Sequence, residues 1–261
     1  MISANKVFLI LGISLIISCN RENPAILEED LLSEHISSDH FDYYYSKADE
    51  DIIDTAWQER FYSWLIDTLD LTLNTKLKYY KYRDVNHIKR VTGNRTNGFA
   101  EVGTNKFHSI WNIDNHECVH TIVTQVIGHP PALFNEGIAV AHQADYFQFP
   151  DFIPGWNGQD FNQLSKDFHQ NGDIPPLGKL IGAHSFWDYN QNMTYPISGS
   201  FVHYLIDTYG LAKMKALIRI SKFEDTSTKI RNDFFSIYSL TIDSAWTDWI
   251  SFITNYHEMN Y

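Results

Sequence analysis

Two histidines stand four residues apart at His116 and His120, and Glu117 directly follows the first of them in the stretch HECVH. Residues four apart on an α-helix share one face, so both imidazoles can point at a single ion. Zinc accepts imidazole and carboxylate ligands, and catalytic zinc sites have three protein ligands and one position for water. Glu117 projects toward that water, which suits a general base rather than a ligand. The spacing therefore predicts a Zn2+ site that needs one further protein ligand.

The elements that must position these residues are predicted to be two helices separated by a break. Apolar residues continue the helical spacing after His120, and Pro130–Pro131 interrupt it. We expect a second helix with Asn135 as its N-cap and Glu136 in its first turn. Gly137 would let this helix approach the first one closely. The competing interpretation is an ordinary buried helix pair, in which Glu136 only favours the helix dipole.

The segment HECVH followed by NEGIA resembles the gluzincin branch of the thermolysin-like zinc metallopeptidases, and the small peptidase MA-like domains in particular. In that family a glutamate on a second helix completes the zinc site. The resemblance implies that the metal ligands are His116, His120 and Glu136. It also implies that Glu117 is the general base in the hydrolysis of peptide bonds.

A second match, YPISGSFVHYLIDTYG at residues 195–210, resembles the tyrosine-led helix of the same family. The two matches occur in the family's order, and the resemblance covers most of the chain from residue 41 onward. It implies that Tyr195, at the start of the match, stabilises the oxyanion of the tetrahedral intermediate. A phenol that donates a hydrogen bond suits this task.

The chain departs from the family at two places. Val140 occupies the position of an acidic residue that orients a zinc-binding histidine in thermolysin, so another group must orient the imidazoles here. Gly98-Phe-Ala-Glu101 is only a fragment of the G-x-M-E-N segment of the aminopeptidases, and it lies too close to His116 along the chain. We therefore do not infer aminopeptidase activity, and we expect Glu101 to be a solvated strand residue.

The remaining histidines and the internal cysteine are expected to have mainly structural roles. His184 precedes the tyrosine-led helix and is the alternative second donor to the oxyanion, while His203 lies on that helix. His129 and His142 flank the two metal-binding helices, where we expect them at the surface or behind the ligands. Cys118 falls on the far side of its helix from the ion, so we expect a small buried hydrophobe.

The spacing of apolar residues elsewhere predicts an α+β fold. The expected elements are a helix over 51–70, a strand over 76–82, a hairpin over 97–111 with its turn at Thr104-Asn105, an irregular stretch over 159–187, and helices over 195–210, 211–221 and 244–256. This pattern indicates a small mixed sheet that packs on the HExxH helix and a mostly helical half that follows. The resemblance to the gluzincins implies that the arrangement is zincin-like. The cleft should lie between the two halves.

The first residues read as an export signal. Lys6 precedes an apolar run over 7–17, which is too short to span a bilayer but suits a signal peptide over residues 1–18. The tetrad Ile-Ile-Ser-Cys, which ends at Cys19, resembles the lipobox of bacterial lipoproteins. The resemblance implies a lipid on Cys19 and a membrane-anchored protein in the cell envelope, while a signal peptide with an incidental cysteine is the alternative.

Residues 19–40 are polar and acidic, and we expect them to be a tether in front of one domain over 41–261. With Cys19 lipidated, Cys118 is the only other cysteine, so no intramolecular disulfide is expected. The chain has a net charge of −12, which becomes −13 when the lysine of the signal peptide is removed. This charge excludes a nucleic-acid-binding protein.

The function predicted from the sequence is zinc-dependent peptide hydrolysis on a peptide or protein substrate. A cell-surface lipoprotein that binds a peptide or glycan through the same cleft, without catalysis or with a narrow specificity, is the first alternative. An amide or ester hydrolase that acts on another substrate, such as a cell-wall peptide, is the second. The sequence does not determine the oligomeric state.

Overall fold

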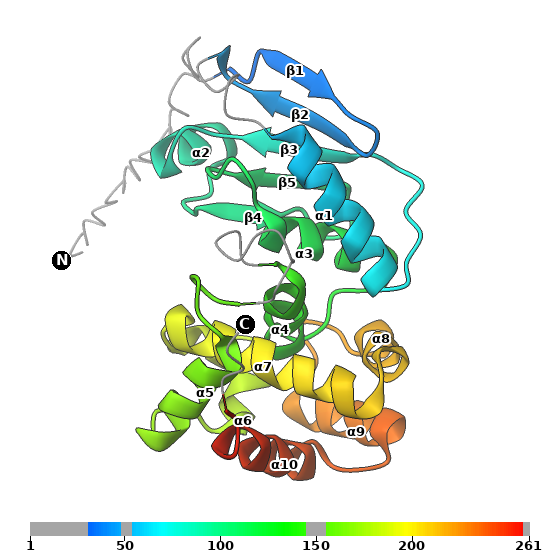
Figure 1. Cartoon of the computed structure of the whole chain (residues 1–261), viewed down its shortest axis with the longest axis vertical. Helices are drawn as coiled ribbons and strands as arrows, with labels where there is room; N and C mark the ends of the chain where they lie inside the picture. The colour runs from blue at the N-terminus through cyan, green and yellow to red at the C-terminus, as the bar shows by residue number, and fades with distance from the viewer. Residues whose placement is uncertain (1–30, 48–53, 145–154, 258–261) are drawn as a thin grey trace, which may run out of the picture.

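The computed structural model describes residues 31–47, 54–144 and 155–257, and within them a five-stranded sheet forms one end of the molecule (Figure 1). The strand order is β1-β2-β3-β5-β4. The strands are β1 (Glu34–Ser37), β2 (Phe41–Tyr45), β3 (Leu77–Lys81), β4 (Gly98–Ala100) and β5 (Lys106–Ser109). The inner pairings β2–β3 and β3–β5 are parallel, and the outer pairings β1–β2 and β4–β5 are antiparallel. The three-residue strand β4 is therefore an edge of a mixed sheet.

One face of this sheet is buried under two helices, α1 (Thr55–Thr68) and α3 (Asn115–Val126) (Figure 1). Alternate residues of the strands point to this face because side chains alternate along a strand. Phe41, Tyr79 and Phe107 are all at most 1% exposed there. Tyr62 of α1 meets the Phe41 ring edge-on at 5.8 Å. The helix that carries the HExxH motif thus packs directly on the sheet, as expected.

The opposite face carries one aromatic or imidazole ring from each strand. The five rings stand directly opposite one another in the strand register, and neighbouring ring centres are 4.4 to 5.0 Å apart. In spatial order they are His35, Tyr44, Tyr80, His108 and Phe99. Cross-strand pairs of this kind stabilise a sheet. The ladder of rings ties the short strand β4 to the other four, and α2 (Val85–Thr92) lies beside it.

The second half of the described chain is helical (Figure 1). Its helices are α4 (Ala132–His142), α5 (Phe161–Gln170), α6 (Leu177–Leu180), α7 (Gln191–Tyr209), α8 (Leu211–Ile220), α9 (Ser227–Tyr238) and α10 (Ile242–Thr254). At this level the predicted α+β class is confirmed.

Two glycines allow α4 and α7 to pack closely. A Cβ atom on Gly137 of α4 would lie 2.7 Å from the carbonyl oxygen of Ser198, and one on Gly199 of α7 would lie 2.4 Å from Cγ1 of Val140. Any side chain at either glycine would therefore clash with the neighbouring helix. Gly137 serves contact with α7, and the expectation that it serves contact with the HExxH helix is wrong.

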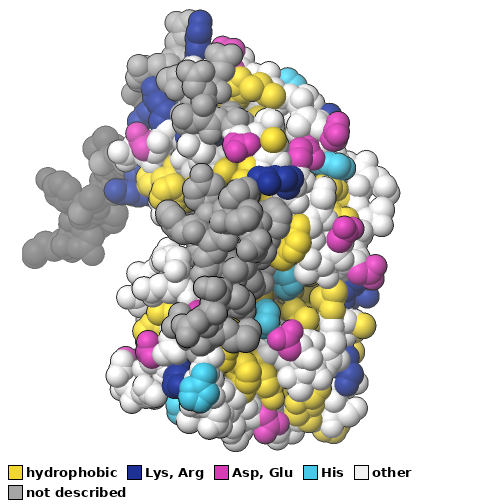
Figure 2. Space-filling view, in the orientation of Figure 1, with side chains coloured by type: hydrophobic (Ala, Val, Ile, Leu, Met, Phe, Trp, Pro, Cys, Tyr) yellow, Lys and Arg dark blue, Asp and Glu magenta, His cyan; other side chains and the backbone are white. Residues whose placement is uncertain are grey.

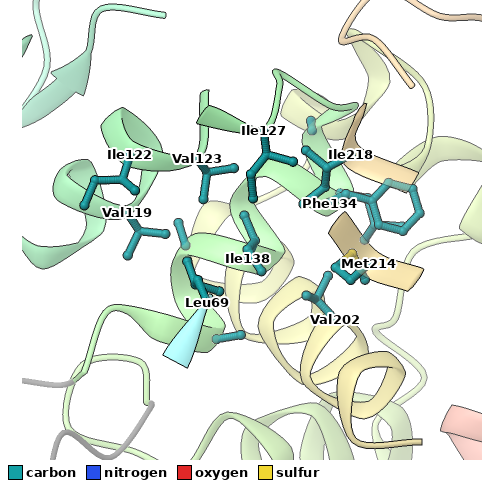
Figure 3. Close-up of a cluster of buried hydrophobic side chains, with 14 of the residues drawn as sticks. Leu69, Val119, Ile122, Val123, Ile127, Phe134, Ile138, Val202, Met214 and Ile218 are labelled. Carbon is teal, nitrogen blue, oxygen red and sulfur yellow. The ribbon is translucent and has the colours of Figure 1, made fainter. Parts of the chain in front are cut away.

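A continuous apolar core joins the sheet half to the helical half behind the motif. Figure 3 shows side chains of α3, α4, α7 and α8 that point toward one another in this core. Among them are Val119, Val123, Phe134, Ile138, Val202 and Met214, all at most 1% exposed. The positions of α3 and α4 are thus fixed by packing, independently of any bound group.

Several predicted elements agree with the structure. The strand over 76–82, the hairpin over 97–111 and the helix that ends at Gly210 are present as β3, as β4 with β5, and as α7. The helices over 211–221 and 244–256 correspond to α8 and α10. Within the described residues, α1 matches the helix expected over 51–70.

Other predictions were wrong. The stretch 159–187 is not irregular, because it contains α5 and α6. Asp160 caps α5 by accepting hydrogen bonds from the backbone N–H groups of Asn162 and Gln163. Phe161, Leu164 and Phe168 have the helical spacing, although polar residues surround them. The strand β1 lies inside the expected tether over 19–40, so the folded part begins at Glu34 rather than at residue 41.

The signal peptide over 1–18 and the lipid site at Cys19 lie outside the described residues. Among the helices that the structure describes, none combines the length and the apolar character needed to cross a bilayer. Acidic side chains are spread over both halves of the face shown in Figure 2, in keeping with the net charge of −12.

Candidate metal centre

The first part of the candidate site is the N-terminal half of α3. Asp114 caps this helix, and its carboxylate accepts a hydrogen bond of 3.0 Å from the backbone N–H of Glu117. An aspartate N-cap satisfies a backbone donor that the helix itself leaves free. His116 and His120 follow on one face of the helix, with their ring centres 4.6 Å apart. The sequence spacing thus brings the two imidazoles together, as predicted.

Glu136 of α4 completes a group of three donor atoms. The Nε2 atoms of His116 and His120 are 3.0 Å apart, and each lies 3.2 Å from Oε2 of Glu136. A tetrahedral ion with ligands at about 2.0 Å separates its ligand atoms by about 3.3 Å. Within the described residues this is the group of histidine, cysteine and acidic side chains that could hold a metal ion. The donor set and its spacing fit zinc.

The helix α4 begins earlier than the sequence suggested. Its N-cap is Pro131, so Asn135 is not an N-cap and lies inside the helix. The side chain of Asn135 instead donates a hydrogen bond of 3.1 Å to Oε1 of Glu136. This contact uses the carboxylate oxygen that does not face the histidines, and it fixes the direction of the other one.

His116 and Glu136 each shift the pKa of the other toward its charged form. Burial lowers the pKa of His116, but the hydrogen bond to Glu136 and the negative charge of Glu117 outweigh it and raise that pKa to about 9. Burial raises the pKa of Glu136, but His120 and His116 hold it well below its usual range. Before a metal binds, the carboxylate therefore carries its charge and an imidazole proton offsets it.

Glu117 lies beside the three donors, under the edge strand β4. A Cβ atom on Gly98 would lie only 2.8 Å from the Asp114 carboxylate and 3.0 Å from Cγ of Glu117, so the strand backbone rests on these side chains. Burial, and then the charge of Asp114, raise the pKa of Glu117 to about 8, while a hydrogen bond to the backbone of Ala100 opposes this shift. A carboxyl group with a raised pKa is suited to accept and release a proton near neutrality.

Tyr195 reaches the site from the first turns of α7. Its ring is stacked on the imidazole of His116 at 5.5 Å and contacts Trp156 at 4.9 Å. Burial raises the pKa of the phenol, and the negative charges of Glu136 and Glu117 raise it further. The phenol therefore keeps its proton and can donate it in a hydrogen bond. Tyr195 thus lines the same cleft as Glu117 and the three donor residues.

These side chains open into a small cleft of about 190 Å3. Its lining combines the edge strand with residues of α3, α4 and α7: Gly98, Phe99, Ala100, Val102, His116, Glu117, His120, Thr124, His129, Asn135, Glu136 and Tyr195. A larger groove of about 550 Å3 lies over the ring ladder of the sheet, and Phe99 lines both. The polar groups that could do chemistry converge in the smaller cleft.

One residue at the site was missed by the sequence reasoning. Oε1 of Gln143 lies 2.9 Å from Nδ1 of His116, and Nε2 of Gln143 donates to the carbonyl oxygen of Gly155 at 2.6 Å. Val140, which is fully buried against α7, makes no such contact. Gln143 is thus a side chain in contact with the nitrogen of His116 that faces away from the other two donors. The only sequence signal was a polar residue directly after α4.

The other candidate residues lie in different places. His184 is 83% exposed and pairs with Glu224, so it is not a donor to this cleft. His203 pairs with Asp207 and contacts Phe161, in agreement with a structural role.

His129 stacks on Phe223 at 4.7 Å and lines the cleft. His142 is buried, and its Nδ1 lies 2.9 Å from the carbonyl oxygen of Ile138. Cys118 is buried in the core, as expected. Glu101 is not simply solvated, because it binds Nε2 of His108 at 3.0 Å and Lys106 at 3.4 Å.

No protein-family model, curated protein or solved structure matches the chain. The resemblance of the two motifs to the gluzincin peptidases therefore stays a prediction.

Proposed function

We propose that this protein is a zinc-dependent peptidase whose ligands are His116, His120 and Glu136. The observation that carries the proposal is the convergence of three donor atoms within 3.2 Å of one another, in the same cleft as Glu117. A metal-binding site that is only structural is normally closed by four protein ligands, whereas a catalytic site has three. The fold would then be a zincin-like one, with α3 and α4 as its metal-binding helices.

The chain's own residues supply the proton transfers. Zinc, when bound, makes a water more acidic and polarises the carbonyl group of a substrate. Glu117 takes the proton from the attacking water and passes it to the leaving nitrogen. The hydroxyl of Tyr195 donates a hydrogen bond to the oxyanion that develops on the carbonyl oxygen.

The edge strand β4 offers a place for an extended substrate. Among the strands of the described residues it pairs only with β5, and its residues Gly98 and Ala100 line the cleft. A peptide in an extended conformation can add to such an edge through main-chain hydrogen bonds. We propose that the substrate is a polypeptide that binds alongside β4, and that the protein is held at a membrane of the cell envelope by a lipid on Cys19.

Cleavage of a peptide library tests this proposal. The full-length chain in detergent, loaded with one equivalent of zinc, is incubated with a diverse mixture of peptides, and the products are identified by mass spectrometry. Glu117→Gln serves as the control because it keeps the size of the side chain and removes the base. Cuts made only by the wild-type protein are expected. Equal cutting by both proteins, or no cutting by a zinc-loaded wild type, would overturn the proposal, and the second result would favour a binding protein.

A further inference from the structure

We infer that Gln143 positions His116 for metal binding, in the place of the acidic residue that the family uses. This inference rests on the proposed metal site but not on peptide hydrolysis. Gln143 follows α4 directly and is half-buried. Its amide bridges two parts of the site, since Oε1 contacts Nδ1 of His116 at 2.9 Å and Nε2 donates to the carbonyl oxygen of Gly155 at 2.6 Å.

The bridge determines which nitrogen of His116 carries a proton. The carbonyl oxygen of Gly155 accepts hydrogen bonds only, so it takes the NH2 end of the Gln143 amide. The oxygen end of the amide must then face Nδ1 of His116, which has to be the protonated nitrogen. Once the imidazole gives up its second proton, as metal binding requires, Nε2 is the nitrogen left with a lone pair, and it points toward His120 and Glu136. The tautomer that can bind a metal through Nε2 is thus selected by a neutral side chain.

The position of Gln143 is fixed by its neighbours. Ala144 adopts a positive φ of 48°, which turns the chain sharply after the helix. Its carbonyl oxygen accepts a hydrogen bond of 3.1 Å from the side chain of Asn115, the residue before His116. The end of α4 is therefore tied to the beginning of α3, so that Gln143 and His116 are held opposite each other.

His116 and His120 differ in the hydrogen bonding of Nδ1. Nδ1 of His120 is buried and has no hydrogen-bond partner within the described part of the chain. Of the two histidines, His116 is therefore the one whose Nδ1 is held by a neighbouring side chain. Partners of this kind commonly change metal affinity by about 10- to 100-fold.

Gln143 is uncharged, and this affects the total charge around a bound ion. Two neutral imidazoles and the Glu136 carboxylate bring one negative charge to a divalent ion, and Gln143 adds none. A carboxylate at position 143 would make His116 a more basic ligand. We therefore expect Gln143→Glu to bind zinc at least as tightly as the wild type.

The test compares Gln143→Leu, Gln143→Glu and the wild type in the full-length chain. Zinc affinity is measured by competition with a chelator, and Gln163→Leu on α5 is the matched control, because the side chain of Gln163 donates to Asp167 of the same helix. We expect about 10- to 100-fold weaker zinc binding for Gln143→Leu, wild-type or tighter binding for Gln143→Glu, and no change for the control. Equal affinity of Gln143→Leu and the wild type would overturn the inference, as would a Glu variant as weak as the Leu variant.

Nitrogen-15 NMR of the histidines in the zinc-loaded proteins gives a second readout that a general loss of stability would not produce. Zinc on Nε2 leaves the proton of His116 on Nδ1 in both proteins, and this proton should exchange with water faster in Gln143→Leu, which lacks the acceptor 2.9 Å away. An unchanged exchange rate in a folded Gln143→Leu protein would count against the inference. Neither measurement depends on cleavage, so a wild type that binds zinc but cuts no peptide would overturn the proposed function and leave the role of Gln143 in place.

Discussion

The ring of Tyr195 is stacked on the imidazole of His116, with 5.5 Å between the ring centres and 19° between the planes. Trp156 contacts the same tyrosine ring at 4.9 Å. These contacts place the phenol beside the ligand group without making it a member of that group. Burial and the charges of Glu136 and Glu117 raise the pKa of the phenol, so the hydroxyl keeps its proton and remains a donor near neutral pH.

Removal of that hydroxyl should slow the reaction without releasing the metal. In Tyr195→Phe the stacking on His116 is kept, while the hydrogen bonds of the hydroxyl, to Glu136 and to the oxyanion, are lost. We expect kcat to fall by about 10²- to 10³-fold, with KM and zinc affinity close to those of the wild type. Tyr204→Phe is the control, because Tyr204 lies on the same helix and packs on Phe252. An unchanged kcat in Tyr195→Phe would exclude the proposed role.

Substitution of a metal ligand and substitution of the general base should have different effects on the zinc content of the protein. His120→Ala removes one of three donors and should lose both zinc and turnover, whereas Glu117→Gln should keep zinc and lose turnover by about 10²- to 10⁴-fold. Equilibrium dialysis followed by metal analysis gives the zinc content of each variant. If Glu117→Gln loses zinc as well, Glu117 is a ligand and not the base.

The close approach of α4 and α7 should make Gly137 sensitive to substitution. In Gly137→Ala the new methyl group meets the carbonyl oxygen of Ser198, and we expect a loss of about 1 to 3 kcal/mol in the free energy of unfolding. Gly178→Ala on α6 is the matched control, because a Cβ atom there meets no atom within 4 Å. Urea denaturation of both variants measures the difference. Equal stability of the two variants would show that the helices can separate without cost.

The metal-free protein should become less stable as the pH rises from about 6.5 to 9. The pKa of His116 is raised to about 9 in the folded state, so the folded protein binds more protons than the unfolded one in this range, and stability falls as the pH increases. The raised pKa of Glu117, about 8, acts in the same direction from pH 4.5 upward.

For His116 alone the loss is on the order of 2 to 3 kcal/mol. Denaturation at pH 6 and pH 9.5, with a chelator and with zinc, measures it. The loss should shrink when zinc is bound, because the ion then replaces the proton on the imidazole. A stability that is equal at both pH values in the metal-free protein would show that the proton on His116 is not held by Glu136.

The ligand histidines could be predicted because their geometry is local. Four residues along one helix determine the relation of His116 to His120, and the apolar residues that follow determine which way that helix faces. The position of Glu136 could be inferred only through the resemblance to known metallopeptidases. The packing of α3 on α4 depends on contacts between two helices, and no short stretch of sequence predicts it.

The missed features all depend on contacts between distant parts of the chain. The bond between Gln143 and His116 joins two helix ends, and neither residue signals the other in the sequence. The parallel pairing of β2 with β3 is likewise invisible in the short strand Phe41–Tyr45, which follows an acidic stretch. The helix α5 was missed because its apolar stripe, formed by Phe161, Leu164 and Phe168, stands among many polar side chains.

If Cys19 carries a lipid, the length of chain between Cys19 and β1 limits the distance between the membrane and the sheet. If a lipid holds Cys19, the fifteen residues from Cys19 to Ser33 can span at most about 50 Å before β1 starts at Glu34. A distance of this size is comparable with the diameter of the protein itself. The cleft would then sample only a thin layer above the bilayer, so that substrates would have to be membrane-bound, or would have to diffuse into that layer, to be cut.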